Sequence, residues 1–465
     1  MNRASYYYAR ELELERQFVR EDPSDLSRQR GVSIALGRMG DVALECREVT
    51  RALGYYQESL GIAEQLAETD PQNVEAQRDR LISLGRVARA QRAGGDNQAA
   101  TDSSRIVLAI AGQLVARAPE GPRSQSDLAT AYIALADLHH AAGKSHDASQ
   151  SLYQALTIRR KLAEKDANDL DAQYRLSIVH ERLFDLHWAA DDVEAALINI
   201  RQCLALRKTL LDRSRDEARF RRGILIAYER LASARRYAGD LTAAEDAGRG
   251  ALAMALKMAN ADPKNEQAQV DLINTEFQLG ITLQRQFKFD AAIDQYQSAL
   301  DNVQRLQDQG VLARRVELKH HPGHLKIHID TCRRYQQVAA DVQFILSQPA
   351  DEVPSFLYDR AVILAQRGRH TAAAQAAQTL AELDPADDGH LYNAACAFAL
   401  YCTVITSSNG NDQRDDYARR ALLLLNEIHA RGYFNDPTRA AWVAEDPDFR
   451  SLHGSDEFRR FLDAL

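Results

Sequence analysis

The chain repeats with a fixed period over its first 310 residues. The junctions Asp22-Pro23 and Asp70-Pro71 stand 48 residues apart, and Asp262-Pro263 follows four further periods along. Repeats of about 20–50 residues are typical of solenoids, in which each unit packs only on its neighbours. Six blocks follow one another without insertion: 23–70, 71–118, 119–166, 167–214, 215–262 and 263–310.

Two positions of the repeat hold the same residue in every block. With Pro23 counted as position 1, position 30 is always alanine and position 38 is always leucine. Position 18 is small except for Phe184, so we expect positions 18 and 30 to mark a close approach of two helices. We expect position 38 to lie in the core. The invariant residues are Ala52, Ala100, Ala148, Ala196, Ala244 and Ala292, and Leu60, Leu108, Leu156, Leu204, Leu252 and Leu300.

The apolar positions of each block follow the period of an α-helix. Positions 10, 14, 17 and 21 share one helical face, and positions 30, 34, 37, 38 and 44 share another. Pairs such as Gly95-Asp96 and Gly143-Lys144 at positions 25 and 26 indicate a chain reversal between the helices. Proline at position 1 suits the start of the first helix. The sequence therefore predicts an all-α chain of stacked helix pairs, each helix about 30 Å long.

The pattern of small and large positions resembles the tetratricopeptide-repeat (TPR) family. Block six carries the family's order of residue types at Leu279, Gly280, Ala292, Tyr296 and Ala299, although the blocks are longer than the family's usual ~34 residues. Residues 354–385 resemble a repeat of ordinary length. The resemblance implies a right-handed TPR-like superhelix of long helix pairs, then a shorter TPR-like C-terminal module, and a role in binding other proteins.

The C-terminal part resembles the TPR tails of large bacterial serine/threonine protein kinases. Residues 391–400 read LYNAACAFAL and residues 446–449 read DPDF, as in those tails. A Gly-rich phosphate loop and the HRD and DFG motifs of a kinase domain are absent from the sequence. The resemblance implies a non-catalytic scaffold. The alternative is a regulatory or substrate-recruiting part of a kinase whose catalytic domain lies elsewhere.

Composition narrows the classes of partner. The chain has 58 Lys+Arg against 66 Asp+Glu, a net charge of −8, which argues against a nucleic-acid-binding protein. Five cysteines without a CxxC pair suggest neither disulfides nor a zinc ribbon. The absence of a long apolar run argues against a membrane span. We therefore expect a cytoplasmic protein with a protein or peptide partner, and neither catalysis nor a cofactor, because no nucleophile–base constellation can be assembled.

Position 16 carries a recurrent positive charge. Four of the six blocks have arginine there, on the first helix of each pair, which lines the inner wall of TPR superhelices. A row of guanidinium groups would suit an acidic peptide or a C-terminal carboxylate. The alternative is local pairing, for example with an aspartate three residues further on. The candidate partner-binding residues are Arg38, Arg86, Arg182 and Arg230.

The densest polar cluster is KHHPGHLKIHIDTC at 319–332. His324, His328 and Cys332 are spaced by four residues on one helical face, and imidazole and thiolate are zinc ligands. A structural site would need a fourth ligand, such as His320 or His321 folding back. The alternative, which we favour, is an ordinary helix with His328 and Cys332 facing inward, and hence no bound metal.

The repeat register also divides the chain into four segments. Counting back from Asp22 places Ala4, Tyr8 and Leu12 at positions 30, 34 and 38, so residues 1–22 match a second helix without its first. We expect such a helix to leave an apolar face for an upstream domain or for self-association. The predicted segments are 1–22 (unpaired helix), 23–310 (six repeats), 311–350 (transition helices) and 351–465 (C-terminal module).

Overall fold

A computed structural model describes residues 3–214, 217–311, 321–404 and 411–465. Within these ranges every regular element is a helix, which confirms the all-α class, and none combines the length and apolar character needed to cross a bilayer. The chain divides into two compact units, Met1–Asp240 (unit 1) and Leu241–Leu465 (unit 2). The four-segment organisation stays a prediction.

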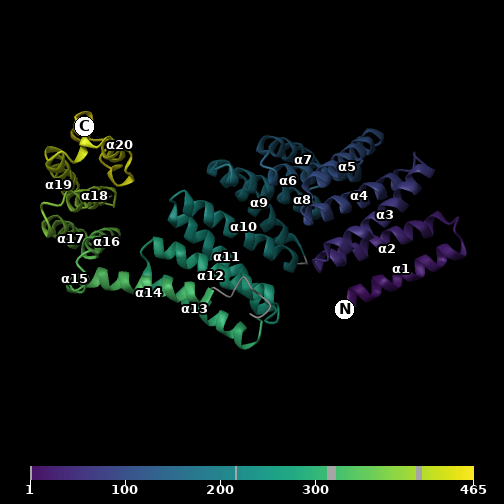
Figure 1. Cartoon of the computed structure of the whole chain (residues 1–465), viewed down its shortest axis with the longest axis horizontal. Helices are drawn as coiled ribbons and strands as arrows, with labels where there is room; N and C mark the ends of the chain where they lie inside the picture. Colours follow the sequence, from purple (N-terminus) through teal and green to yellow (C-terminus); the bar gives the residue numbers. More distant parts are fainter. Residues whose placement is uncertain (1–2, 215–216, 312–320, 405–410) are drawn as a thin grey trace. The chain divides into compact units, whose positions relative to one another are not determined.

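Unit 1 is a series of long helices, each packed on the next along the chain (Figure 1). Starts of the first helices at Leu26, Val74, Pro122 and Leu170 recur every 48 residues, as the repeat predicts. The helices are α1 (Arg3–Glu21), α2 (Leu26–Glu45), α3 (Val49–Thr69), α4 (Val74–Ala93), α5 (Asn97–Arg117), α6 (Pro122–Ala141), α7 (Ser145–Lys165), α8 (Leu170–Ala189), α9 (Val193–Arg213) and α10 (Glu217–Tyr237).

Unit 2 begins with two further long pairs and continues with shorter helices. The ordinary-length repeat expected at 354–385 corresponds to α16 and α17, of 14 residues each. The elements are α11 (Leu241–Ala261), α12 (Glu266–Arg285), α13 (Phe289–Asp308), α14 (His321–Ala340), α15 (Val342–Leu346), α16 (Val353–Gln366), α17 (His370–Leu383), α18 (Asp388–Val404), α19 (Asn411–Ala430), η2 (Tyr433–Asn435), α20 (Pro437–Glu445), η3 (Pro447–Phe449) and α21 (Asp456–Asp463).

In blocks one, two, four and six the first helix begins at position 4, after a side-chain cap at position 3. The carboxylate of Asp25 and the amide oxygen of Asn73 accept hydrogen bonds from backbone N–H groups of the first turn. Pro23 and Pro71 thus lie in the turn before the cap. The helices start three residues after these prolines, whereas the preference of proline for the first helical position predicted a start at the proline itself. The cap fixes the helix start because its side-chain oxygen accepts from the free backbone N–H groups of the first turn, and a proline side chain has no acceptor.

Position 25 makes the reversal between the two helices of a pair through a positive φ. Glycine suits this backbone because it has no Cβ, and three blocks have it, as the sequence predicts. The other three blocks place a larger residue in the same conformation. The φ values are 85° at Gly95, 71° at Gly143 and 78° at Gly239, against 63° at Arg47, 58° at Asp191 and 58° at Phe287.

The close approach of the paired helices is where the small residues predict it. All six position-30 alanines are 0% exposed. Position 18 faces position 34: a Cβ added to Gly280 would lie 2.5 Å from the Tyr296 ring, and one added to Gly40 would lie 2.4 Å from the Tyr56 ring. Glycine at position 18 therefore makes room for a tyrosine on the opposite helix.

The core expectation for position 38 holds only in part. Leu156 and Leu204 are buried, but the other four leucines are half-buried, whereas position 37 is buried in all six blocks. Positions 30, 34 and 37 form the centre of the buried stripe, and position 38 lies at its edge. Helix α1 also differs from expectation, because Leu12 and Tyr8 pack against α2, while Tyr6 and Tyr7 are exposed. The side chain of Ala4 lies outside the described residues.

Candidate functional site

The position-16 arginines pair mainly with carboxylates of the preceding block. In three of the four, the acceptor is the aspartate at position 19 of that block, 45 residues earlier. Only Arg182 also contacts the aspartate three residues further on, Asp185, at 3.8 Å. The inter-block pairs are Arg86–Asp41 at 2.9 Å, Arg182–Asp137 at 3.4 Å and Arg230–Asp185 at 3.0 Å.

The first arginine of the row pairs with α1 instead. Arg38 contacts the carboxylate of Glu11, and its guanidinium lies 5.8 Å from the centre of the Tyr8 ring. Asp41, its neighbour in sequence, instead accepts hydrogen bonds from Arg86 and Arg89. The position-16 arginines therefore connect first helices of neighbouring blocks through ion pairs. Some of these arginines share their carboxylate with a second arginine, as Arg86 and Arg89 share Asp41.

A stripe of isoleucines runs beside the arginines. Ile34 is 37% exposed and Ile82 is 40% exposed, and each lies four residues before an arginine of the row, hence on the same helical face. We missed this stripe in the sequence, where position 12 stands out as apolar on an otherwise polar face. We call these residues the Ile–Arg face: Ile34, Ile82, Ile178 and Ile226 with Arg38, Arg86, Arg182 and Arg230.

The Ile–Arg face is hollowed between neighbouring blocks. A cavity of about 440 Å³ is lined by both Arg92 and Arg182 and by the carboxylates of Asp137 and Asp185. A second, of about 260 Å³, is more apolar and includes Val107 and Ile133 in its wall. Of the residues of the Ile–Arg face, Arg182 lines the first cavity, whereas the second lies beside Thr130 and Ala134, which occupy positions 12 and 16 of block three.

The three weak metal candidates lie on α14 in different environments. His324 is exposed, while the His328 ring stacks on Tyr296 at 5.0 Å and its Nδ1 lies 3.0 Å from Oε1 of Gln284. Cys332 is fully buried, and burial raises the pKa of its thiol to about 11. The proposed fourth ligands cannot be placed, since His320 and the side chain of His321 lie outside the described residues. His328 and Cys332 thus have packing roles.

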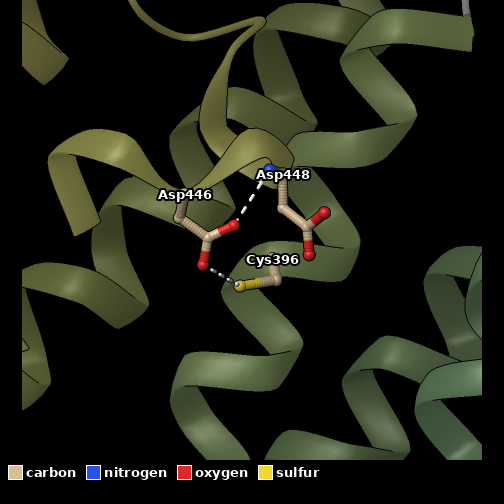
Figure 2. A group of neighbouring side chains, drawn as sticks. All are labelled: Cys396, Asp446 and Asp448. Atoms are coloured by element: carbon tan, nitrogen blue, oxygen red, sulfur yellow. Dashed lines mark hydrogen bonds between the residues drawn. The ribbon is translucent and has the colours of Figure 1, made fainter. Parts of the chain in front are cut away.

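A different polar cluster joins the two C-terminal motifs (Figure 2). Cys396 comes from α18, and Asp446 and Asp448 come from the DPDF segment. Their ligand atoms lie within 4.8 Å of one another, near enough for a shared metal ion. Both motifs are visible in the sequence, but their spacing along the chain does not indicate that their side chains come into contact.

Hydrogen bonds already occupy the carboxylates of this cluster. The Tyr392 and Tyr358 hydroxyls donate to Asp446 and Asp448, both at 2.7 Å, and the Asp448 N–H donates to Asp446 at 3.0 Å. Burial raises the pKa of the Cys396 thiol and of the Asp448 carboxyl, which disfavours the charged forms that bind metals. The arrangement is a hydrogen-bonded clamp that holds the closing helices onto α16 and α18.

We expect Asp446→Asn to loosen this clamp. An amide cannot accept from Tyr392, Cys396 and the backbone without turning a donor toward one of them, so the closing segment should lose about 1–2 kcal/mol of local stability. Faster amide hydrogen exchange across α20 and α21 would show it. Asp463→Asn, at an exposed site in α21, is the control. Equal exchange in the two variants would contradict the clamp.

A family model matches one of the repeats. The tetratricopeptide-repeat model matches residues 128–166, which span most of α6 and the whole of α7. The chain contains a tetratricopeptide repeat. This TPR unit lies within block three, and the same helix-pair geometry recurs before and after it.

Solved structures share parts of the helical architecture at low identity. BtubC (BKLC) from P. vanneervenii is 19% identical with a TM-score of 0.44, over 55% of this chain and 91% of that one. Putative kinesin light chain TPR-like repeats from Podosopora anserina are 20% identical with a TM-score of 0.32, over 48% and 97%. A thermophilic TPR protein from Thermus thermophilus is 22% identical with a TM-score of 0.28, over 52% and 98%. None of the curated proteins matches the chain.

Proposed function

We propose that the chain is a non-catalytic, cytoplasmic TPR scaffold whose Ile–Arg face binds an acidic, amphipathic segment of a partner protein. The observation that carries this is the pairing of an exposed or half-exposed isoleucine with an arginine four residues later in four of the six blocks. Apolar side chains of the partner would pack on the isoleucines, and its carboxylates would bind the guanidinium groups, as in other peptide-binding repeats.

Charge sharing on this face supports an acidic partner. Asp41 is contacted by both Arg86 and Arg89, and Asp137 by both Arg92 and Arg182. Asp41 therefore neutralises only one of its two guanidinium groups, whereas Arg182 also contacts Asp185 at 3.8 Å. A partner carboxylate could take up the remaining positive charge through a charge-assisted, bidentate hydrogen bond.

We expect Arg86→Ala combined with Arg230→Ala to weaken partner binding about tenfold, since two partly exposed charge contacts of about 0.2–1 kcal/mol each would be lost. The probe is a fluorescein-labelled acidic peptide selected on the wild-type chain from a random library, with affinity measured by anisotropy at several salt concentrations. The salt dependence should flatten, because fewer charges attract the peptide.

The matched control removes two exposed arginines away from the face. Arg105 pairs with Asp102 on α5, and Arg175 pairs with Asp171 on α8. Arg105→Ala with Arg175→Ala should leave the affinity unchanged. Thermal stability should barely change in the control, whereas the Arg86→Ala/Arg230→Ala variant should lose some stability, because Arg230 also pairs with the half-buried Glu181 carboxylate. An equal loss of affinity in the two variants, or no loss in either, would contradict the proposal.

A second candidate is the regulatory or substrate-recruiting part of a serine/threonine kinase. The meeting of the LYNAAC and DPDF motifs through Tyr392, Cys396 and Asp446 favours it, because these motifs carry the resemblance to kinase tails. Immunoprecipitation of the native protein, followed by incubation with labelled ATP and mass spectrometry, tests it. A precipitate without kinase polypeptide or phosphate transfer would rule it out.

A further inference from the structure

A cavity of about 640 Å³ opens in unit 2, away from the Ile–Arg face. Its wall comes from the C-terminal end of α12, from α13, α14, α16 and α18, and from the DPDF segment. Aromatic rings and acids dominate the lining: Phe287, Phe289, Tyr335, Tyr358, Asp359 and Asp448. Nothing in the proposed function uses this cavity.

Asp359 is the unusual member of the lining. Its carboxylate is half-buried, and within the described residues it has neither a hydrogen bond nor an ion pair, whereas Asp448 accepts a hydrogen bond from Tyr358. Burial raises the pKa of Asp359 to about 6, so the group is mostly ionised at neutral pH. A half-buried carboxylate without a partner lowers the stability of the fold, and a bound cation would compensate it.

The aromatic side of the cavity also suits a cation. The Phe289 ring stacks on Tyr335 at 5.7 Å and meets Phe287 edge-on at 6.1 Å. The guanidinium of Arg367 already lies 5.3 Å from the centre of the Phe289 ring, so this group of rings accepts a cation.

Phe287 also belongs to the cavity wall, at the turn position that Arg47 and Asp191 occupy in other blocks with a similar positive φ. Its φ of 58° belongs to a conformation that blocks two, three and five reach with glycine. Here the side chain completes the aromatic wall.

We propose that this cavity binds a lysine or arginine side chain of a partner polypeptide, with Asp359 as the counter-charge. The apolar stem of either side chain would pack between the aromatic rings while its charged head reaches the carboxylate. The cationic groups in the lining do not fill that role: Arg285 is exposed, and burial lowers the pKa of His328, which keeps the ring neutral.

The test uses blocked amino acids as probes and methyl groups as reporters. Ile281 and Ile363 line the cavity, and Ile198 lies in unit 1. In the full chain with isoleucine methyls labelled by ¹³C, we titrate N-acetyl-lysine methylamide, N-acetyl-arginine methylamide and the neutral isostere N-acetyl-citrulline methylamide. The lysine or arginine probe should shift the Ile281 and Ile363 methyl resonances saturably and leave that of Ile198 unchanged. Citrulline should cause little shift.

Asp359→Asn is the decisive variant. It should weaken binding of the cationic probe at least about tenfold, while Asp351→Asn, at an exposed site before α16, should not. The Asp359→Asn chain should also melt at a higher temperature, because it no longer buries an unpaired charge. A merely structural carboxylate would lower the melting temperature when removed. Unchanged affinity in Asp359→Asn, equal binding of citrulline, or no saturable shift would each overturn the proposal.

Discussion

Gly280→Ala is expected to lower the free energy of unfolding by about 2 kcal/mol, although alanine is the better helix former. The new Cβ would lie 2.5 Å from Cε1 of Tyr296. That ring is fully buried and its hydroxyl donates to Gln284 at 2.8 Å, so it cannot move aside freely. Overpacking of about 1–3 kcal/mol in a rigid core exceeds the gain of about 1 kcal/mol from helix propensity.

Another block of the repeat suggests a second substitution that should restore stability to Gly280→Ala. In block three, position 18 is Ala136 and the facing position 34 is Leu152. Adding Tyr296→Leu to Gly280→Ala should therefore recreate a native combination. The double variant should lose about 1–2 kcal/mol less than the sum of the single losses.

Denaturant titration with hydrogen exchange in α12 and α13 measures both effects. Gly85→Ala, in α4, is the matched control, because its Cβ would meet nothing within 4 Å. That change should be neutral or mildly stabilising. Strict additivity of the Gly280 and Tyr296 changes would show that positions 18 and 34 are not coupled.

Helix pairs and their close contacts could be predicted from the sequence because six blocks sample the same environment. An alanine kept six times at position 30 reports a steric limit, and all six copies are fully buried. An invariant residue type at a repeat position did not indicate how deeply that position is buried, however. Position 38 is invariant leucine but lies at the edge of the stripe, whereas Ser59 and Cys203 at position 37 are buried. The size of the side chain at a repeat position indicates how much space is available there, and it does not indicate how far the position lies from solvent.

The inter-block ion pairs were predictable in principle. Arginine at position 16 follows aspartate at position 19 of the preceding block in each of the three pairs above, yet pairing was sought only within one helix. The cavity around Asp359 could not be found in this way. It brings Phe287, from block six, together with Asp359 and Asp448, which lie beyond the end of the repeats. Such long-range contacts leave no periodic trace in the sequence.

Arg207→Ala should destabilise unit 1 strongly, with a loss of about 3–5 kcal/mol. Position 41 holds alanine or valine in blocks one, two, five and six, but Arg207 occupies it in block four and is only 2% exposed. Its guanidinium donates to the Gly223 carbonyl at 2.8 Å and to the Ser177 hydroxyl at 3.3 Å, and it contacts Glu181. One side chain thus joins α8, α9 and α10, and its removal leaves buried acceptors without donors.

Changes at Glu181 distinguish the electrostatic part of this loss from the part due to lost packing. Arg207→Met keeps much of the volume, so it should lose less than Arg207→Ala while still leaving the buried carboxylate with Arg230 alone. Adding Glu181→Gln to Arg207→Met should then recover part of the stability. Arg201→Ala, at an exposed site on α9, should stay within about 0.5 kcal/mol of the wild type. Hydrogen exchange in α8–α10 is the readout, and equal losses in Arg207→Ala and Arg201→Ala would mean that the buried guanidinium does not hold the three helices together.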